Sequence, residues 1–166
     1  MSRRDQIKMT DDEVRAYIEA GRDLHMATIG PDGAPHMVTM WYGLVDGNFA
    51  VWTYGKSQKV LNLQRDPRIT CLLADGDTYS TLRGVQVVGR AELLHDPEDV
   101  ARIGEAVHVR NAHRFGDVEI PAPQGGTEVD EGTRDVLRVM GAKRVGIVVH
   151  PDQVVSWDHG KLGGTY

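Results

Sequence analysis

The segment best suited to chemistry runs from Tyr54 to Asn62 and reads Tyr-Gly-Lys-Ser-Gln-Lys-Val-Leu-Asn. Ser57 is placed to begin a helix, whose first amides have no internal partners and whose dipole favours an anion. The Ser57 hydroxyl and the ammonium groups of Lys56 and Lys59 would add donors and positive charge. The segment therefore predicts a phosphate site. The alternative is a lysine-rich helix start that faces solvent, and the motif is not a P-loop.

Aromatic residues in the preceding segment strengthen the first interpretation. Trp41, Trp52 and Tyr54 lie on what the pattern predicts to be a hairpin that leads directly into the lysine segment. A planar ligand with a phosphate tail needs a flat apolar surface beside an anion site. We therefore expect a ligand of that shape.

Other side chains that often carry chemistry fit ordinary structural roles. None of the seven histidines forms the His-x-x-x-His pair of a helical zinc site, and His108 and His113 are typical of a solvated helix. Cys71 stands among Ile69, Leu72 and Leu73, which indicates a buried thiol and not a nucleophile. No Gly-x-Ser-x-Gly elbow occurs. We expect no metal site.

The first elements that must position these groups are a helix and a set of strands. Residues 8–22 predict an N-terminal helix with a Thr10–Glu13 capping box and a left-handed stop at Gly21. Residues 24–94 predict a barrel core of short strands, including a hairpin that pairs 36–45 with 49–54. Gly84 and Gly89 within 81–94 indicate bulges or a sharp bend.

The second half of the chain predicts helices followed by closing strands. Residues 96–141 predict two helices joined by a loop at 115–132 that is placed to cover a pocket. Residues 143–157 predict two closing strands, with a turn at Pro151 between them. We expect a single domain over 1–166, of mainly β class, in which an antiparallel barrel carries helical decorations.

Composition narrows the classes of partner. The chain has 166 residues, a formal net charge of -5 and one cysteine. A negative net charge argues against binding to nucleic acid or to an anionic membrane surface. No apolar run is long enough to span a membrane, and residues 1–6 do not read as a secretory signal. We expect a cytoplasmic protein.

The stretch from Leu24 to Leu94, and less specifically the final strand, resembles a known family. It carries Asp32-Gly33-Ala34-Pro35, Ser57-Gln58-Lys59 and 62–68, Asn-Leu-Gln-Arg-Asp-Pro-Arg. These residues are similar to the flavin- and deazaflavin-binding split barrels of the pyridoxamine 5′-phosphate oxidase-like superfamily. The match is strongest to the branch that uses coenzyme F420. The resemblance implies an FMN-binding split barrel of antiparallel Greek-key type, which assembles as a homodimer with shared cofactor sites.

The resemblance also implies a set of cofactor contacts. One strand would lie along the ring, the end of a second would face it, and the following turn would hold the phosphate. The implied residues are, in that order, His36, Met37, Val38, Thr39 and Met40, then Thr53 and Tyr54, then Lys56, Ser57, Gln58 and Lys59.

Two residues near the C-terminus complete the implied set. Trp157 and Lys161 have the spacing of a tryptophan and a basic residue that approach the flavin in oxidases of the superfamily. Lysine lacks the planar fork of arginine, which argues against oxidation of pyridoxamine phosphate. Trp157 is equally consistent with a place in the core or in a dimer contact.

Three functions follow from these expectations. The first is an oxidoreductase that passes a hydride from reduced F420 to a small conjugated acceptor, whose proton would come from water or from a tyrosine such as Tyr42 or Tyr54. The second keeps the fold and uses FMN. The third is a protein that binds a flavin, F420 or haem without catalysis.

Overall fold

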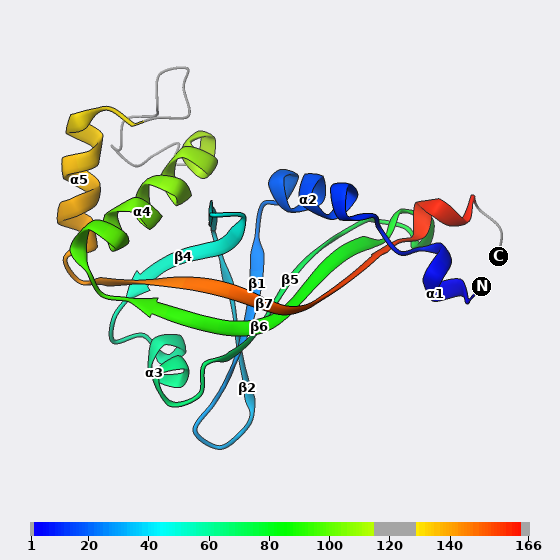
Figure 1. The fold of residues 1–166 in the computed structure, drawn as a ribbon, viewed down its shortest axis with the longest axis horizontal. Helices are drawn as coiled ribbons and strands as arrows, with labels where there is room; N and C mark the ends of the chain where they lie inside the picture. The colour runs from blue at the N-terminus through cyan, green and yellow to red at the C-terminus, as the bar shows by residue number, and fades with distance from the viewer. Residues whose placement is uncertain (1, 115–128, 164–166) are drawn as a thin grey trace.

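The structure is a computed structural model that describes residues 2–114 and 129–163, built around one sheet with helices at its margins (Figure 1). The strands are β1 (Leu24–Ile29), β2 (Pro35–Met40), β3 (Gly43–Val45), β4 (Asn48–Tyr54), β5 (Arg68–Asp75), β6 (Arg83–Leu94) and β7 (Arg144–Asp158). The α-helices are α1 (Arg3–Gln6), α2 (Asp11–Ala20), α3 (Gln58–Arg65), α4 (Pro97–Asn111) and α5 (Glu131–Gly141). Short 3₁₀ turns are η1 (Tyr79–Thr81), η2 (Ala112–Arg114) and η3 (His159–Leu162).

The seven strands form one antiparallel sheet in the order β2-β1-β5-β6-β7-β4-β3. The sheet curls on itself as a split barrel, so the predicted fold class is confirmed. β6 and β7 run side by side along the length of the molecule, with α4 and α5 at one end and η3 at the other (Figure 1). This long ladder separates the parts of the molecule that the sequence had grouped into one site.

The curled sheet has an apolar cluster on each face. The inner cluster includes Leu24, Met26, Val51 and Ile147, all at most 1% exposed. The outer cluster lies between the sheet and α4, where Trp41 and Trp52 pack against buried residues such as Ile103. Because successive side chains of a strand point to opposite faces, β4 contributes to both clusters.

The predicted N-terminal helix is confirmed, but its end differs. The Thr10 hydroxyl accepts from the Glu13 amide and the Glu13 carboxylate accepts from the Thr10 amide, which completes the capping box. Gly21 is extended and not left-handed (φ -61°, ψ 156°). Its missing side chain makes room instead, because a Cβ there would come within 2.6 Å of the Tyr42 hydroxyl and 2.7 Å of Leu73.

The predicted hairpin of 36–45 with 49–54 is confirmed only at its turn end, where 43–45 pair with 48–50; residues 36–40 do not pair with β4. β2 pairs with β1, and the hairpin into β4 comes from the short β3 alone, joined through Asp46 and Gly47. Trp41 and Tyr42 lie in neither strand. Gly43 then passes close to α4, where a Cβ would come within 2.5 Å of the Ala106 backbone.

The predicted turn at Pro151 is wrong. β7 continues from Arg144 to Asp158 through that proline, which lies opposite Gly89 where the β6–β7 register shifts. Proline is tolerated in a strand at a bulge, because the bulge already interrupts the ladder of hydrogen bonds. Gly89 is the predicted bulge. Gly84 is a site of close approach, because a Cβ there would meet the Trp157 ring at 2.4 Å.

The helices α4 and α5, which follow β6, each begin at an aspartate that caps the first amides. The Asp96 carboxylate accepts from the Glu98 and Asp99 amides at the start of α4. The predicted loop at 115–132 lies largely outside the described residues, but residues 129–132 are described and lead into α5. Val129 is buried and Asp130 caps α5, which begins at Glu131.

Among the described residues, no helix is long and apolar enough to cross a membrane.

Candidate functional site

Thr53, Ser57 and Lys59 form a compact polar cluster where β4 leads into α3, which we call the cradle. The Lys59 ammonium donates to Thr53 Oγ1 at 3.0 Å, and the Ser57 hydroxyl lies 3.5 Å from the same oxygen. Thr53 is buried, whereas Ser57 and Lys59 are half-buried. The cradle thus gathers one cation and two hydroxyls, as an anion site requires.

The start of α3 adds to the cradle. Ser57 is the N-cap by backbone geometry, but its side chain makes no capping hydrogen bond. The hydroxyl is turned toward Thr53, so it does not satisfy the first amides of its own helix. The first two of those amides, at Gln58 and Lys59, are available for an anion, which the helix dipole also favours. Lys56 and Gln58 are exposed at the margin.

Burial lowers the pKa of the Lys59 ammonium from its ordinary value. Desolvation disfavours the charged form of an amine, and within the described residues no carboxylate lies within ion-pair distance of this ammonium. A bound phosphate would supply the missing negative charge. The cradle therefore fits the phosphate of a flavin or deazaflavin.

A buried amide connects α3 to the neighbouring strands. Asn62 is fully buried, accepts from the Gln58 side chain at 2.8 Å and donates to Thr28 Oγ1 at 3.0 Å. The Thr28 hydroxyl in turn donates to the His36 carbonyl at 3.5 Å. Asn62 and Gln58 thus hold α3 against β1 and β2.

The strand predicted to lie along the cofactor ring is β2, at the edge of the sheet. His36, Val38 and Met40 are half-buried, whereas Met37 and Thr39 are exposed. Met37 is 63% exposed, and Tyr54 at the end of β4 is 58% exposed. Large side chains this open to solvent are typical of a surface that meets a ligand or another subunit.

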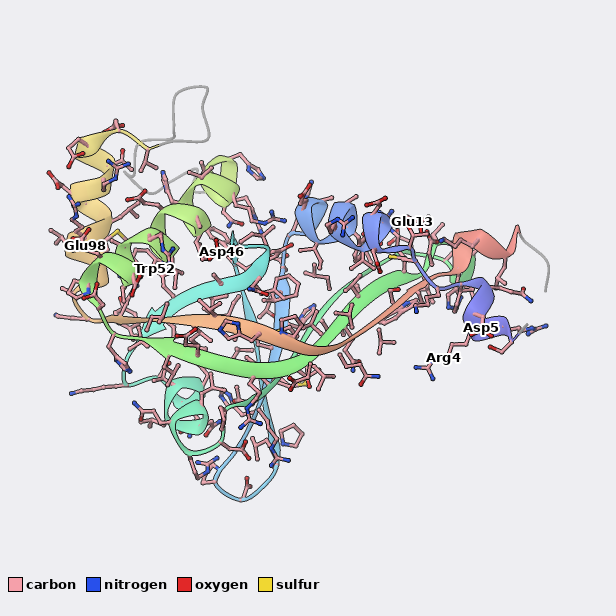
Figure 2. The ribbon with its side chains drawn as sticks, in the orientation of Figure 1. Arg4, Asp5, Glu13, Asp46, Trp52 and Glu98 are labelled. Atoms are coloured by element: carbon pink, nitrogen blue, oxygen red, sulfur yellow. The ribbon has the colours of Figure 1, made fainter. Side chains whose placement is uncertain are left out.

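A pocket of about 370 Å³ lies on the outer side of β4, beneath α4 and α5; we call it the tryptophan pocket. Figure 2 labels Trp52 beside α4. The residues that define this pocket are Trp41, Trp52, Gly104, His108, Met140 and Arg144. Thr39 and Met40, at the end of β2, also line it. β2 therefore runs from the neighbourhood of the cradle to this pocket.

Trp157 and Lys161 lie far from the cradle within one chain. Val145, which pairs with Thr53, and Trp157 are separated by most of β7, a run of roughly 40 Å at ~3.3 Å per residue. The Lys161 ammonium pairs with Glu13 and donates to the Lys8 carbonyl at 3.0 Å. The structure thus separates these two residues from the rest of the predicted site, and their cofactor role stays a prediction.

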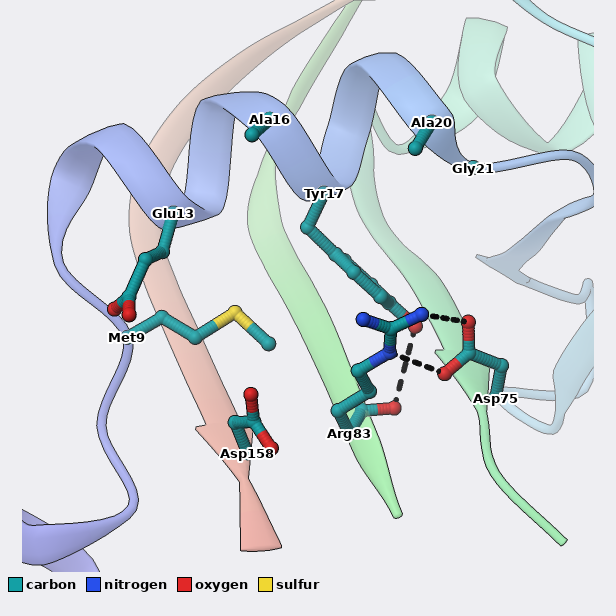
Figure 3. A pocket seen from close by; sticks show the side chains of 9 residues that line it. All are labelled: Met9, Glu13, Ala16, Tyr17, Ala20, Gly21, Asp75, Arg83 and Asp158. Carbon is teal, nitrogen blue, oxygen red and sulfur yellow. Dashed lines mark hydrogen bonds and ion pairs between the residues drawn. The ribbon is translucent and has the colours of Figure 1, made fainter. Parts of the chain in front are cut away.

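A second pocket, of about 380 Å³, lies at that far end of the sheet (Figure 3). Arg83 pairs with Asp75 at 2.8 Å, and the Tyr17 hydroxyl donates to the Arg83 carbonyl at 3.3 Å. Glu13 and Asp158 also line this pocket. A pocket lined by three carboxylates and one arginine that is already paired does not suit a phosphate.

Cys71 and His108 are both buried. Cys71 is fully buried, and burial raises the pKa of its thiol to about 12, so the structural interpretation is confirmed. His108 is 1% exposed on the inner side of α4, so its prediction as a solvated residue is wrong. Within the described residues, no group of three or more His, Cys, Asp and Glu side chains is arranged to hold a metal ion.

Tyr42 and Tyr54 differ as proton donors. Tyr42 is fully buried; its hydroxyl donates to the Ile18 carbonyl, accepts from Arg110 at 2.8 Å, and has its pKa raised by desolvation. It is therefore committed to structure. Tyr54 is exposed and lies 4.8 Å from the Arg144 guanidinium. Sequence reasoning missed Arg144, because only the pairing of β4 with β7 brings it beside Trp52 and Tyr54.

Comparison with solved structures gives the same fold. A conserved hypothetical protein from Mycobacterium tuberculosis is 38% identical, over 100% of this chain and 95% of that chain, with a TM-score of 0.84. An F420 reductase is 23% identical, over 84% of this chain and 94% of that chain, with a TM-score of 0.58. A haem storage protein from Vibrio cholerae is 12% identical, over 90% and 97%, with a TM-score of 0.63.

A search of curated proteins finds no match. A family model described as pyridoxamine 5′-phosphate oxidase, however, matches residues 10–156, which span β1 to β6 and β7 as far as Ser156. The cradle, the β2 edge and most of the β6–β7 ladder fall within the matched range. This chain therefore belongs to the pyridoxamine 5′-phosphate oxidase family of flavin-binding split barrels.

Proposed function

We propose that the protein is an F420-dependent reductase that passes a hydride from the reduced deazaflavin to a small conjugated acceptor. The observation that carries this proposal is the cradle, in which Lys59, Thr53 and Ser57 converge at the start of α3. The F420 reductase among the structural neighbours supports the proposal at the level of the fold.

The residues of the chain bind and orient in this proposal. Lys59 and the hydroxyls of Thr53 and Ser57 hold the phosphate, and β2 from His36 to Met40 lies along the ring. The bound deazaflavin supplies the hydride, while the protein positions the ring and shapes the acceptor pocket. Tyr54, exposed at the end of β4, is the tyrosine placed to give a proton to the reduced acceptor.

FMN is the second candidate cofactor, because the family binds flavins and both cofactors present a flat ring, a ribityl-type chain and a phosphate. The F420 tail adds negatively charged glutamates beyond the phosphate. Lys56, exposed beside the cradle, supplies positive charge outside the phosphate site. This residue favours F420.

We propose further that two copies of the chain share each site. Trp157 and Lys161 are too far along β7 to reach the cradle of their own chain, so a partner would have to supply them. Met37 and Tyr54, both more than half exposed, would be covered in such a dimer.

Titration of the purified protein with F420, FMN and haem, followed by absorbance and fluorescence, tests the cofactor. We expect the tightest binding with F420, and oxidation of reduced F420 in the presence of a quinone such as naphthoquinone. Tight binding of FMN alone would favour the second candidate. Haem binding without turnover would favour a storage protein.

A further inference from the structure

The tryptophan pocket holds a positive charge that the cradle does not use. The Arg144 guanidinium lies 4.6 Å from the centre of the Trp52 ring and 4.8 Å from that of Tyr54. It also donates to the Met140 carbonyl at the end of α5. Two aromatic rings and a carbonyl hold the group in place, so it is an ordered cation beside a pocket and not a mobile surface side chain.

Arg144 differs in its partners from the arginines that form ion pairs. Arg83, Arg114, Arg134 and Arg138 each pair with a carboxylate. In the part of the chain that the structure describes, no carboxylate lies within 4.0 Å of the Arg144 guanidinium. A half-buried, oriented guanidinium without a counter-ion has donors left for an anion.

The rest of the pocket is flat, apolar and already formed. Trp41 and Trp52 line one side, and Leu137 and Met140 of α5 line another. Trp52 is held against α4 at Gly104, where a Cβ would come within 2.7 Å of the ring. The ring therefore occupies its place because position 104 has no side chain. Such walls suit a planar aromatic molecule.

We propose that the tryptophan pocket binds a flat aromatic ligand that carries a negative charge, and that Arg144 holds the charge. The inference rests on the proposed function in one respect: it takes this ligand to be the hydride acceptor. Thr53 and Trp52 are neighbours on β4, so the cradle and the pocket lie on opposite faces of that strand. Thr39 and Met40 bring the end of β2 to the pocket, so an acceptor there would adjoin a ring held along β2.

Two fluorescent probes that differ in one charged group test the pocket without any cofactor. Anilinonaphthalene sulfonate is an aromatic anion, and N-phenylnaphthylamine is a neutral molecule of similar shape. We expect the anion to bind the purified full chain the more tightly. Arg144→Met should weaken binding of the anion by roughly 10–150-fold, the range for loss of a charge-assisted hydrogen bond, and change binding of the neutral probe less than about threefold.

Three further variants locate the effect. Arg90→Met removes an exposed strand arginine outside the pocket and should change neither probe. Arg144→Lys keeps the charge without the fork and should restore part of the affinity for the anion. Met140→Trp fills the pocket and should weaken both probes. The proposal is overturned if Arg144→Met weakens both probes equally, or if a folded Met140→Trp protein binds the anion as tightly as the parent.

Repeating the probe titrations with cofactor present separates this inference from the proposed function. Prior saturation with F420 or FMN should leave binding of the anionic probe intact; displacement would assign the pocket to the cofactor and overturn the inference. If neither cofactor binds, the proposed function fails, while the probe series still judges the pocket. With turnover, Arg144→Met should raise KM for hydroxynaphthoquinone, which is anionic at neutral pH, and leave KM for naphthoquinone unchanged. An equal change in both would again contradict the inference.

Discussion

Lys59 is the residue at which the proposed cofactor binding is most directly tested. Lys59→Ala should raise the dissociation constant for the cofactor roughly 10–150-fold, because an ammonium–phosphate contact contributes ~1.5–3 kcal/mol. The loss should shrink as salt rises, since screening already weakens the contact in the parent. Burial lowers the pKa of Lys59, so affinity in the parent should fall as pH rises through that pKa.

The melting temperature provides the control for Lys59. Burial disfavours the charged ammonium, so its removal should leave the melting temperature without cofactor unchanged or slightly higher. Lys8→Ala, at an exposed position in the N-terminal segment, should affect neither measurement. Unchanged affinity for both F420 and FMN in Lys59→Ala would show that the cradle does not bind the phosphate.

Cys71 gives a second prediction at this scale. Burial raises the pKa of its thiol to about 12 from the ordinary 9.0, so the native thiol should not react with an aromatic disulfide reagent near pH 8. In urea the same thiol should react at once. Because the pKa is raised on folding, its contribution to stability is complete below about pH 9 and is lost as pH rises toward 12. Rapid labelling of the native protein would contradict the assigned burial.

At the scale of elements, Arg110 of α4 joins two helices. Its Nη2 lies 2.6–2.8 Å from the carbonyl oxygens of Ile18, Glu19 and Gly21, at the C-terminal end of α2. The guanidinium also lies 4.2 Å from the centre of the Tyr42 ring. A cation suits the negative end of a helix dipole, so this contact fixes α2 to the body of the protein.

Arg110→Met should therefore lower the free energy of unfolding by about 1.5–3 kcal/mol, the range for hydrogen bonds to a charged group. Chemical denaturation measures this directly. Arg102→Met is the matched control on the same helix. Arg102 is exposed and makes a long, weak ion pair with Asp99 at 3.5 Å, so the free energy of unfolding should change by no more than about 0.5 kcal/mol. Equal effects from the two variants would mean that the contact with α2 contributes nothing of its own.

Elements defined by neighbouring residues could be predicted from the sequence, and pairings between distant residues could not. The capping box of α2 and the Asp96 cap of α4 depend on residues three apart or fewer, and both are confirmed. The partner of β2 is β1, and no signal within 36–54 states that choice. Pro151 is tolerated within β7 because β6 has a bulge opposite it. That bulge lies in a distant part of the sequence, so the residues around Pro151 predict a turn.

The same distinction applies to the candidate site. Thr53, Ser57 and Lys59 lie within one short segment, so the sequence could group them. Arg144 lies beside Trp52 only because of the register of β4 with β7. His108 is buried because sheet residues far away in the chain cover its helix, and the sequence around His108 does not show this contact. Trp157 and Lys161 were grouped with the cradle by resemblance alone. Because they lie so far along β7, the grouping requires that a second chain supply them.

At the scale of the whole molecule, we expect a homodimer. Met37 and Tyr54 are 63% and 58% exposed, and their burial between two chains would remove apolar surface from water. Light scattering at micromolar concentration should give about twice the chain mass of 18.3 kDa. Met37→Asp should shift the population toward monomer, whereas Val139→Asp, at an even more exposed apolar position on α5 (77%), should not. A mass near 18.3 kDa for the parent would exclude sites shared between chains.

The bulge at Gly89 and Pro151 divides the longest ladder of the sheet into two parts. Pro151 has no amide hydrogen, and the register shifts between Val88 and Gly89, so the cooperative network of hydrogen bonds is weakest there. Native-state hydrogen exchange should therefore show two levels of protection: slow amides in 145–148 beside β4, and faster ones beyond Pro151. The far end of the sheet could then open and close while the half that carries the cradle and the tryptophan pocket stays folded.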